Sequence, residues 1–243
     1  MSKFFIKKPL WAIFFILLII ITVGCRGRNR DKNEPDPNYL LTFDWEEAVI
    51  VGYFGDEEEV IIPNMINGLP TRQIGTAGFM DNTFITSVVI PEGVFLIDSN
   101  AFAQCSNLTS VTLPSTLTHI GNSAFYLTGL TSLPDWPPEL TEILPGVFSY
   151  SKLRSAYIAE GVTVIGALAF GNCPDLEIVS LPSTIISIDA LAFARNPSLT
   201  TVIIPESVEH IEFSGNGSEF SNNPNLSPES REALRRVGYT GNF

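Results

Sequence analysis

One short phrase recurs along the chain at a nearly constant interval. From Leu108 the sequence reads LTSVTLPSTLTHIGNSAF, and from Leu176 it reads LEIVSLPSTIISIDALAF, with the apolar letters in the same places and the polar letters changed. A repeat of this length predicts a solenoid, a stack in which each repeat, here called a rung, contacts mainly its two neighbours. The shared isoleucines are Ile74, Ile97, Ile120, Ile143, Ile165, Ile188 and Ile211, and the closing phenylalanines are Phe79, Phe102, Phe125, Phe148, Phe170, Phe193 and Phe220.

The period is 23 residues, apart from one step of 22 between Ile143 and Ile165, and the rung itself is altered at two places. One rung is a residue longer and reads LTSLPDWPPEL from Leu130 to Leu140. The last step, from Phe193 to Phe220, is lengthened by an insert at residues 214–218. The rungs therefore share a scaffold that these two places modify.

Each rung is expected to form two short β-strands and a short helical turn. In LTSVTLP the apolar residues alternate with polar ones near the strand period of two. Proline then ends the strand because it has no N–H to donate. The THIG segment adds a second strand with Ile120 inward, and NSAF begins with a residue type that caps helices. Only stacking buries these apolar faces, each large side chain contributing about 1.5–3 kcal/mol.

The repeat resembles that of a known family. The pattern LxxVxLPxxLxxIgxxAFxxCxxL is filled by LTSVTLPSTLTHIGNSAF and by FAQCSNL and FGNCPDL, and it covers residues 74–226. This pattern is similar to the BspA-like, or Treponema pallidum type, leucine-rich repeat. The resemblance implies a curved solenoid on secreted or surface-attached bacterial proteins, often linked to adhesion and host-protein binding.

Both ends of the repeat region are expected to be capped. The resemblance implies a strand-rich N-terminal cap at residues 39–73, which would cover the first open sheet edge. At residues 227–243, Ser227 is an N-cap, Pro228 the first helical residue and Gly238 a stop signal. These signals predict a short helix that closes the stack.

The first 25 residues indicate export. Residues 1–24 are a predicted lipoprotein signal peptide, because their basic start precedes an apolar run shorter than the about 20 residues needed to cross a bilayer. The ending from Thr22 to Cys25 resembles a lipobox, which implies cleavage before Cys25 and its lipidation. Thr22 departs from the usual leucine, so an uncleaved anchor is the alternative. Residues 25–38 are polar and are predicted to be a flexible tether.

Charge argues against a nucleic-acid partner. The chain has a net charge of −12, and removal of residues 1–24 leaves 11 basic against 26 acidic residues, a net of −15. Nucleic-acid binding needs clustered Lys and Arg. Acidity of this size keeps an exposed protein soluble. We expect a monomer that contacts a membrane through its lipid anchor only.

No side chains converge into a catalytic or metal centre. His119 and His210 lie four rungs apart, roughly 19 Å, because stacked strands are about 4.8 Å apart. Cys105 and Cys173 lie three rungs apart, roughly 14 Å, whereas a disulfide tolerates about 7 Å between Cα atoms. We interpret both cysteines as buried turn residues that bond to the backbone of the next rung. Other rungs carry Asn82, Asn196 and Asn223 at this position.

No motif supplies an alternative chemistry. The chain contains no GxSxG, P-loop or HExxH sequence. The acidic stretch at residues 56–59 lacks the ligand spacing of a calcium loop and is predicted to be a solvated hairpin tip. The protein is therefore expected to be non-enzymatic and to need no cofactor or metal.

Function must then lie where the rungs differ. Trp136 in the irregular PDWPP turn lies near Arg154, Tyr157 and Glu177 when repeats are counted. Trp, Tyr and Arg are enriched at binding hot spots, so these four residues form a candidate partner surface. The alternative for Trp136 is that it fills a gap left by the irregular rung.

The resulting hypothesis is a lipid-anchored bacterial envelope protein, displayed from the outer membrane, that binds a protein ligand such as host extracellular matrix or another cell's surface. One alternative is a structural lipoprotein that faces the periplasm. A further alternative is a module that binds or hydrolyses carbohydrate.

Overall fold

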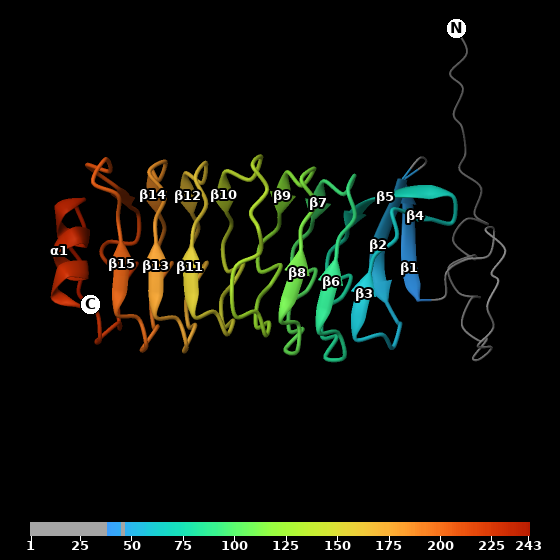
Figure 1. The fold of residues 1–243 in the computed structure, drawn as a ribbon, viewed down its shortest axis with the longest axis horizontal. Helices are drawn as coiled ribbons and strands as arrows, with labels where there is room; N and C mark the ends of the chain where they lie inside the picture. Colours follow the sequence, from blue (N-terminus) through green and yellow to red (C-terminus); the bar gives the residue numbers. More distant parts are fainter. Residues whose placement is uncertain (1–37, 45–46) are drawn as a thin grey trace, which may run out of the picture. The chain divides into compact units, whose positions relative to one another are not determined.

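The computed structural model describes residues 38–44 and 47–243, which belong to one compact unit. Figure 1 shows the rungs of this part lying side by side and ending at helix α1 (Pro228–Arg236). The repeat solenoid predicted from the period is confirmed. The predicted signal peptide, residues 1–24, the lipidation site Cys25 and the tether that follows it up to residue 37 lie outside the described residues.

Each regular rung contributes one strand to each of two rows. The first row contains β3 (Glu59–Ile61), β6 (Ser87–Val89), β8 (Ser110–Thr112), β11 (Ser155–Tyr157), β13 (Ile178–Ser180) and β15 (Thr201–Ile203). The second row contains β7 (Leu96–Ile97), β9 (His119–Ile120), β10 (Glu142–Ile143), β12 (Val164–Ile165), β14 (Ser187–Ile188) and β16 (Glu212–Phe213). Neighbouring strands within a sheet are parallel and pair equivalent positions, such as Val88 with Val111. The middle residue of each first-row strand points into the core and is buried.

The N-terminal end is closed by strands that run in both directions. They are β1 (Tyr39–Asp44), β2 (Glu47–Tyr53), β4 (Met65–Ile66) and β5 (Leu69–Ile74). In the sheet, β5 lies between β2 and β7 and is parallel to both. β4 pairs antiparallel with the start of β5, and β1 pairs antiparallel with β2. The cap therefore ends the second row with an antiparallel strand, which covers the sheet edge that the first rung would expose.

The acidic stretch at residues 56–59 is exposed, as expected, but it is not a hairpin tip. It leads from β2 into β3, and these two strands belong to different sheets. The prediction of a hairpin was wrong because successive strands of a solenoid rung pair with the neighbouring rungs and not with each other.

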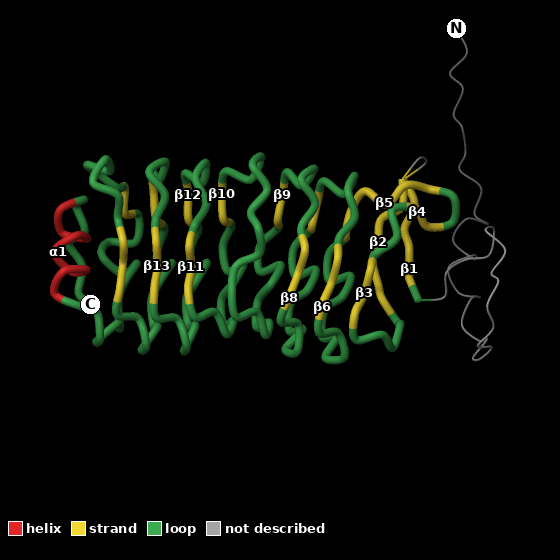
Figure 2. Tube along the Cα trace, viewed as in Figure 1, coloured by secondary structure: helices red, strands yellow, loops and turns green. Residues whose placement is uncertain are grey.

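The short helical turn predicted in each rung is instead a run of overlapping β-turns, drawn as loop in Figure 2. The Ala124 N–H donates to the Gly121 carbonyl at 3.2 Å, whereas the Ser123 N–H donates to Pro145 of the next rung at 2.9 Å. Ser123 has a left-handed φ of 56°. Because alternate N–H groups are used between rungs, the i to i−4 bonds of a helix cannot form.

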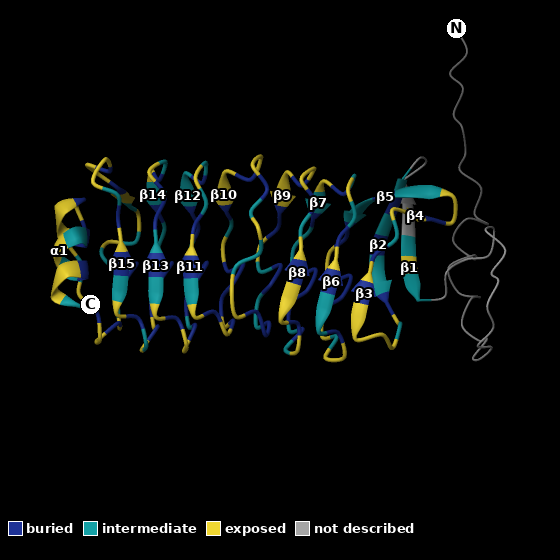
Figure 3. Cartoon of the chain, viewed as in Figure 1, coloured by how far each residue is buried: buried dark blue, intermediate teal, exposed yellow. Residues whose placement is uncertain are grey.

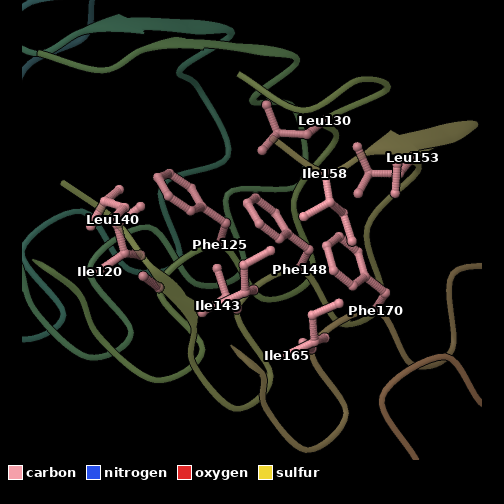
Figure 4. Packing of buried hydrophobic residues seen from close by; sticks show 14 of the residues in the cluster. Ile120, Phe125, Leu130, Leu140, Ile143, Phe148, Leu153, Ile158, Ile165 and Phe170 are labelled. Atoms are coloured by element: carbon pink, nitrogen blue, oxygen red, sulfur yellow. The ribbon is translucent and has the colours of Figure 1, made fainter. Parts of the chain in front are cut away.

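A ladder of phenylalanine rings runs through the core. Figure 4 shows three of its members beside columns of aliphatic side chains. Tyr53 extends the ladder at one end with a ring-centroid distance of 5.0 Å, and Tyr239 closes the other end edge-on at 5.6 Å. The seven closing phenylalanines are buried, and neighbouring rings stack with centroids 4.9–5.8 Å apart.

A polar ladder lies three residues after each phenylalanine. The Cys105 Sγ donates to the Phe79 carbonyl at 3.0 Å, and the Asn196 Nδ2 donates to the Phe170 carbonyl at 2.9 Å. The predicted bond between rungs is thus present, but its acceptor belongs to the preceding rung. The members are Asn82, Cys105, Thr128, Ser151, Cys173, Asn196 and Asn223.

Both rows are interrupted at the irregular rung. In the first row, no strand forms at residues 131–133, so β8 and β11 belong to separate sheets. In the second row, β9 and β10 do not pair and also belong to separate sheets. Within the described residues, only the turn side joins the two halves by a regular ladder, including the Phe125 N–H to Val147 carbonyl bond at 3.0 Å. The Phe125–Phe148 ring spacing of 5.8 Å is the widest in the ladder.

The C-terminal end follows its sequence signals. The Ser227 Oγ accepts the Ser230 N–H at 3.2 Å, proline occupies the first turn of α1, and Gly238 has a φ of 105° beyond its end. The Ser230 Oγ in turn accepts the Val202 N–H of β15 at 2.9 Å. The predicted helical cap is confirmed, and it satisfies the last strand of the first row. Within the described residues, no helix is both long and apolar enough to cross a bilayer.

We predict that Phe148→Ala lowers the free energy of unfolding by about 3–5 kcal/mol, because it leaves a cavity in a fully buried ladder. Urea unfolding followed by circular dichroism measures this loss. The matched control is Tyr157→Ala, whose side chain is 61% exposed and whose loss should stay within about 0.5 kcal/mol. Equal losses for the two variants would contradict the proposed role of the ladder.

Candidate functional site

Three of the four sequence-predicted site residues come together on the first row. Tyr157 ends β11 and is 61% exposed, and Arg154 lies exposed just before this strand. Glu177 occupies the position of Arg154 in the next rung, and its N–H donates to the Arg154 carbonyl at 2.9 Å. Arg154 and Glu177 are therefore neighbours on adjacent rungs, just before β11 and β13, and Tyr157 is exposed at the far end of β11.

Trp136 is placed differently. Its side chain is half-buried against the hydrophobic core, with its ring centroid 6.2 Å from that of Phe148. Its Nε1–H donates to the Leu140 carbonyl at 2.8 Å, so its polar group already has a partner within the irregular turn. This geometry favours the alternative in which Trp136 fills the gap left by the irregular rung.

The irregular rung also determines where the candidate surface lies. β11 is the first strand of its sheet and pairs on one side only, with β13. Towards the irregular rung, the Arg154 N–H donates to the Thr131 carbonyl at 3.1 Å just before the strand begins. Tyr157 therefore stands at a strand edge next to the interruption in the row.

Exposed positions recur along the first row (Figure 3). Ile61 of β3 is 75% exposed and stands opposite Val89. The sequence analysis missed Ile61 because it lies 28 residues before Val89, whereas the repeat spacing is 23. The available signal was the strand-forming segment EVI, in which Val60 faces inward and Ile61 outward. The outward column reads Ile61, Val89 and Thr112 before the interruption and Tyr157, Ser180 and Ile203 after it.

A small cleft lies in the second row. It has a volume of about 90 Å³ and lies between residues 118–120 and 139–144, where β9 and β10 fail to pair. Ligand pockets are usually about 300–1,000 Å³. Within the described residues, no three His, Cys, Asp or Glu side chains converge to hold a metal ion.

The two described cysteines are buried and unpaired with each other. Burial raises the pKa of the Cys105 thiol to about 12 and that of Cys173 to about 11. The Cys173 Sγ lies 3.3 Å from the Phe148 carbonyl and 3.4 Å from the Ser151 Oγ. Because the nucleophilic species is the thiolate, these environments suit a structural hydrogen bond and not a reactive thiol.

Comparisons with known proteins identify the repeat. A family model described as "BspA type Leucine rich repeat region" matches six copies, over residues 72–200 and 141–227, which is more than half of the 243-residue chain. Among curated proteins, no sequence similar to this chain was found.

Solved structures share the fold. A leucine-rich repeat protein of T. pallidum matches with a TM-score of 0.75 and 25% identity, over 87% of this chain and 98% of its own. A leucine-rich cell surface protein of Faecalibacterium prausnitzii A2-165 matches with a TM-score of 0.59 and 26% identity, over 83% of this chain and 55% of its own. A leucine-rich repeat protein of Eubacterium ventriosum ATCC 27560, at 21% identity and a TM-score of 0.62 over 76% of this chain and 50% of its own, supports the fold alone.

We predict that Cys105 and Cys173 resist alkylation by iodoacetamide at pH 8 in the folded protein, because raised pKa values keep both as buried thiols. Both should react once the chain is unfolded in guanidinium chloride. Peptide mapping by mass spectrometry reports the two sites separately, and the unfolded sample of the same preparation serves as the internal comparison. Rapid labelling of Cys173 under native conditions would contradict the assignment.

Proposed function

Because the chain belongs to the BspA-type leucine-rich repeat family, we propose that it is a lipid-anchored, non-enzymatic protein of a bacterial envelope that binds a protein ligand. Leucine-rich repeat proteins of this family are bacterial surface or envelope proteins, and such repeats generally act as protein-binding modules. The ligand is a protein of the host matrix or of another cell's surface.

The exposed face of β11, β13 and β15 around Tyr157 is the binding surface in this proposal. Tyr157 supports it because this 61%-exposed aromatic residue belongs to a strand whose backbone is already fixed by pairing before a ligand arrives. Little conformational entropy is then lost on binding. Arg154 and Glu177, just before β11 and β13, offer a donor and an acceptor at the edge of such an aromatic contact.

Trp136 has a supporting role. Its side chain packs beneath the irregular turn beside the candidate surface. We propose that it holds the interrupted end of the row in shape and does not contact the ligand directly. Substitution of Trp136 would therefore affect stability as well as binding.

Attachment to the membrane is proposed through Cys25. The apolar run followed by the lipobox-like ending supports cleavage before this residue and acylation of its thiol. Two or three acyl chains give stable anchoring, whereas one gives only reversible binding. The polar segment that follows would let the repeat region extend from an outer membrane towards the outside of the cell.

We predict that Tyr157→Ala weakens binding to the protein ligand by about 30-fold, because loss of a hot-spot residue costs about 2 kcal/mol or more. The ligand is first identified on an array of matrix proteins and glycans, and affinity is then measured by surface plasmon resonance. Thr112→Ala is the matched control, since Thr112 occupies the same outward column before the interruption. Equal affinities for the two variants would overturn this surface, and binding to glycans alone would favour the carbohydrate alternative.

We predict that protease added to intact cells degrades the repeat region, because an outward-facing domain is accessible without permeabilisation. Immunoblotting measures its disappearance, with a known periplasmic protein as the protected control. Cys25→Ser should abolish incorporation of labelled fatty acid. Survival of the repeat region until the outer membrane is permeabilised would contradict display on the outside of the cell and favour the periplasm-facing alternative.

A further inference from the structure

Glu219 stands where every other rung carries an uncharged residue no larger than valine. It immediately precedes the closing Phe220, and its side chain is fully buried. The equivalent residues in the other six rungs are Gly78, Ala101, Ala124, Val147, Ala169 and Ala192. The same rung contains the insert at residues 214–218, so the only carboxylate in this column coincides with an insert in the chain.

Only one of the two oxygens of the Glu219 carboxylate has a hydrogen-bond partner. Its Oε1 accepts the Gly215 N–H at 2.5 Å. Its Oε2 is the one buried side-chain nitrogen or oxygen atom without a hydrogen-bond partner within residues 38–44 and 47–243. Burying an ionised carboxylate without compensation costs several kcal/mol, so a buried carboxylate oxygen ordinarily has a donor or a cation beside it.

Within the described residues, no basic side chain bonds to this oxygen. Arg235 reaches the same end of the stack, but its two guanidinium nitrogens donate to the carbonyls of Tyr239 and Gly241, both at 2.7 Å. The next group towards the C-terminus is the Tyr239 side chain, whose hydroxyl donates to the Gly217 carbonyl at 2.9 Å. A cation bound from solution would compensate the charge of this oxygen.

The surroundings of Glu219 are rich in oxygen. The Ser218 Oγ donates to the Gly215 carbonyl at 2.8 Å, and the Ser214 Oγ donates to the Asp189 carboxylate at 2.8 Å. The Ser218 Oγ and the Glu219 Oε1 lie on the same side of Gly215, so a hydroxyl oxygen and a carboxylate oxygen of this rung are neighbours. Such oxygens are the ligands of hard cations.

We propose that Glu219 and the insert at residues 214–218 form a binding site for a calcium ion. No three His, Cys, Asp or Glu side chains converge in the described part of the chain, so most ligands of an ion here would be backbone carbonyls, hydroxyls and waters. Ca²⁺ accepts backbone carbonyls, hydroxyls and waters in flexible arrangements of six to eight ligands, whereas Mg²⁺ demands near-ideal octahedral geometry. The carbonyls of Gly215 and Gly217 and the hydroxyl of Ser218 in the insert are ligands of the kind that Ca²⁺ accepts.

Calcium at this position would fasten the C-terminal cap to the last rung. The Tyr239 hydroxyl bonds to the Gly217 carbonyl of the insert and lies 3.0 Å from the Asn242 carbonyl. The Tyr239 ring also closes the phenylalanine ladder. An ion that holds the insert in place therefore stabilises the end of the solenoid, where a stack of repeats needs capping. This inference does not depend on the identity of the protein ligand.

The test is calcium titration of the full chain, solubilised in mild detergent and treated with a chelator. We expect isothermal titration calorimetry to give one saturable site and thermal unfolding to shift upwards by several degrees, because a ligand that binds only the folded state stabilises it. Terbium, a luminescent substitute for calcium, should bind at the same site and be displaced by calcium.

The decisive variant is Glu219→Gln, which keeps the shape of the side chain and its acceptor for Gly215 but removes the charge. We expect calcium affinity at least about tenfold weaker, because ligand charge tunes Ca²⁺ affinity, and no thermal shift. Glu232→Gln, on the exposed face of α1, is the matched control and should bind calcium normally. Glu219→Ala restores the residue type of the other rungs and provides a second folded reference.

Two results would overturn the calcium site. The first is a wild-type chain whose unfolding temperature and titration heats do not respond to calcium. The second is a Glu219→Gln variant that binds with wild-type affinity, which would indicate an adventitious ion at the acidic surface only. Greater stability of Glu219→Ala, together with no calcium response in the wild type, would identify Glu219 as a simple buried substitution.

Discussion

The alternating use of backbone N–H groups on the turn side is the constraint on which the stack depends. Each turn gives one N–H to itself and the next to the following rung, as Ala124 and Ser123 do. This pattern requires residues with a left-handed backbone conformation in the turns, which raises the free energy of the folded state. Burial of the phenylalanine ladder beneath the turns offsets this increase. At the irregular rung both rows of strands are interrupted, yet these turn bonds continue and keep the two halves in one stack.

This constraint separates scaffold from surface. The inward positions must repeat because every ring contacts the rings of its neighbours, so they carry no information about a ligand. The outward positions are free to differ. Tyr157, Arg154 and Glu177 lie in the two rungs that follow the irregular rung. Trp136 lies between the two roles, because its ring packs near Phe148 while the turn that holds it borders the candidate surface.

Local rules failed where contacts between rungs decided the conformation. NSAF has a helix-capping residue type, but its N–H groups are committed to the next rung, so β-turns form. The acidic stretch at residues 56–59 resembled a hairpin tip, but its flanking strands pair elsewhere. Ile61 escaped notice because the cap does not keep the 23-residue spacing. Glu219 gave no sign of burial, since only the stacked rungs show that its column is inside.

The sequence by itself determined the architecture and its two ends. A periodic row of apolar residues can be buried in one way, by stacking, and the Ser227, Pro228 and Gly238 signals act within a few residues of each other. Only the tertiary structure decided that Trp136 packs against the core, away from the exposed Tyr157, and that one oxygen of Glu219 lacks a partner. These outcomes depend on which atoms of neighbouring rungs are in contact, and the order of residues along the chain does not contain that information.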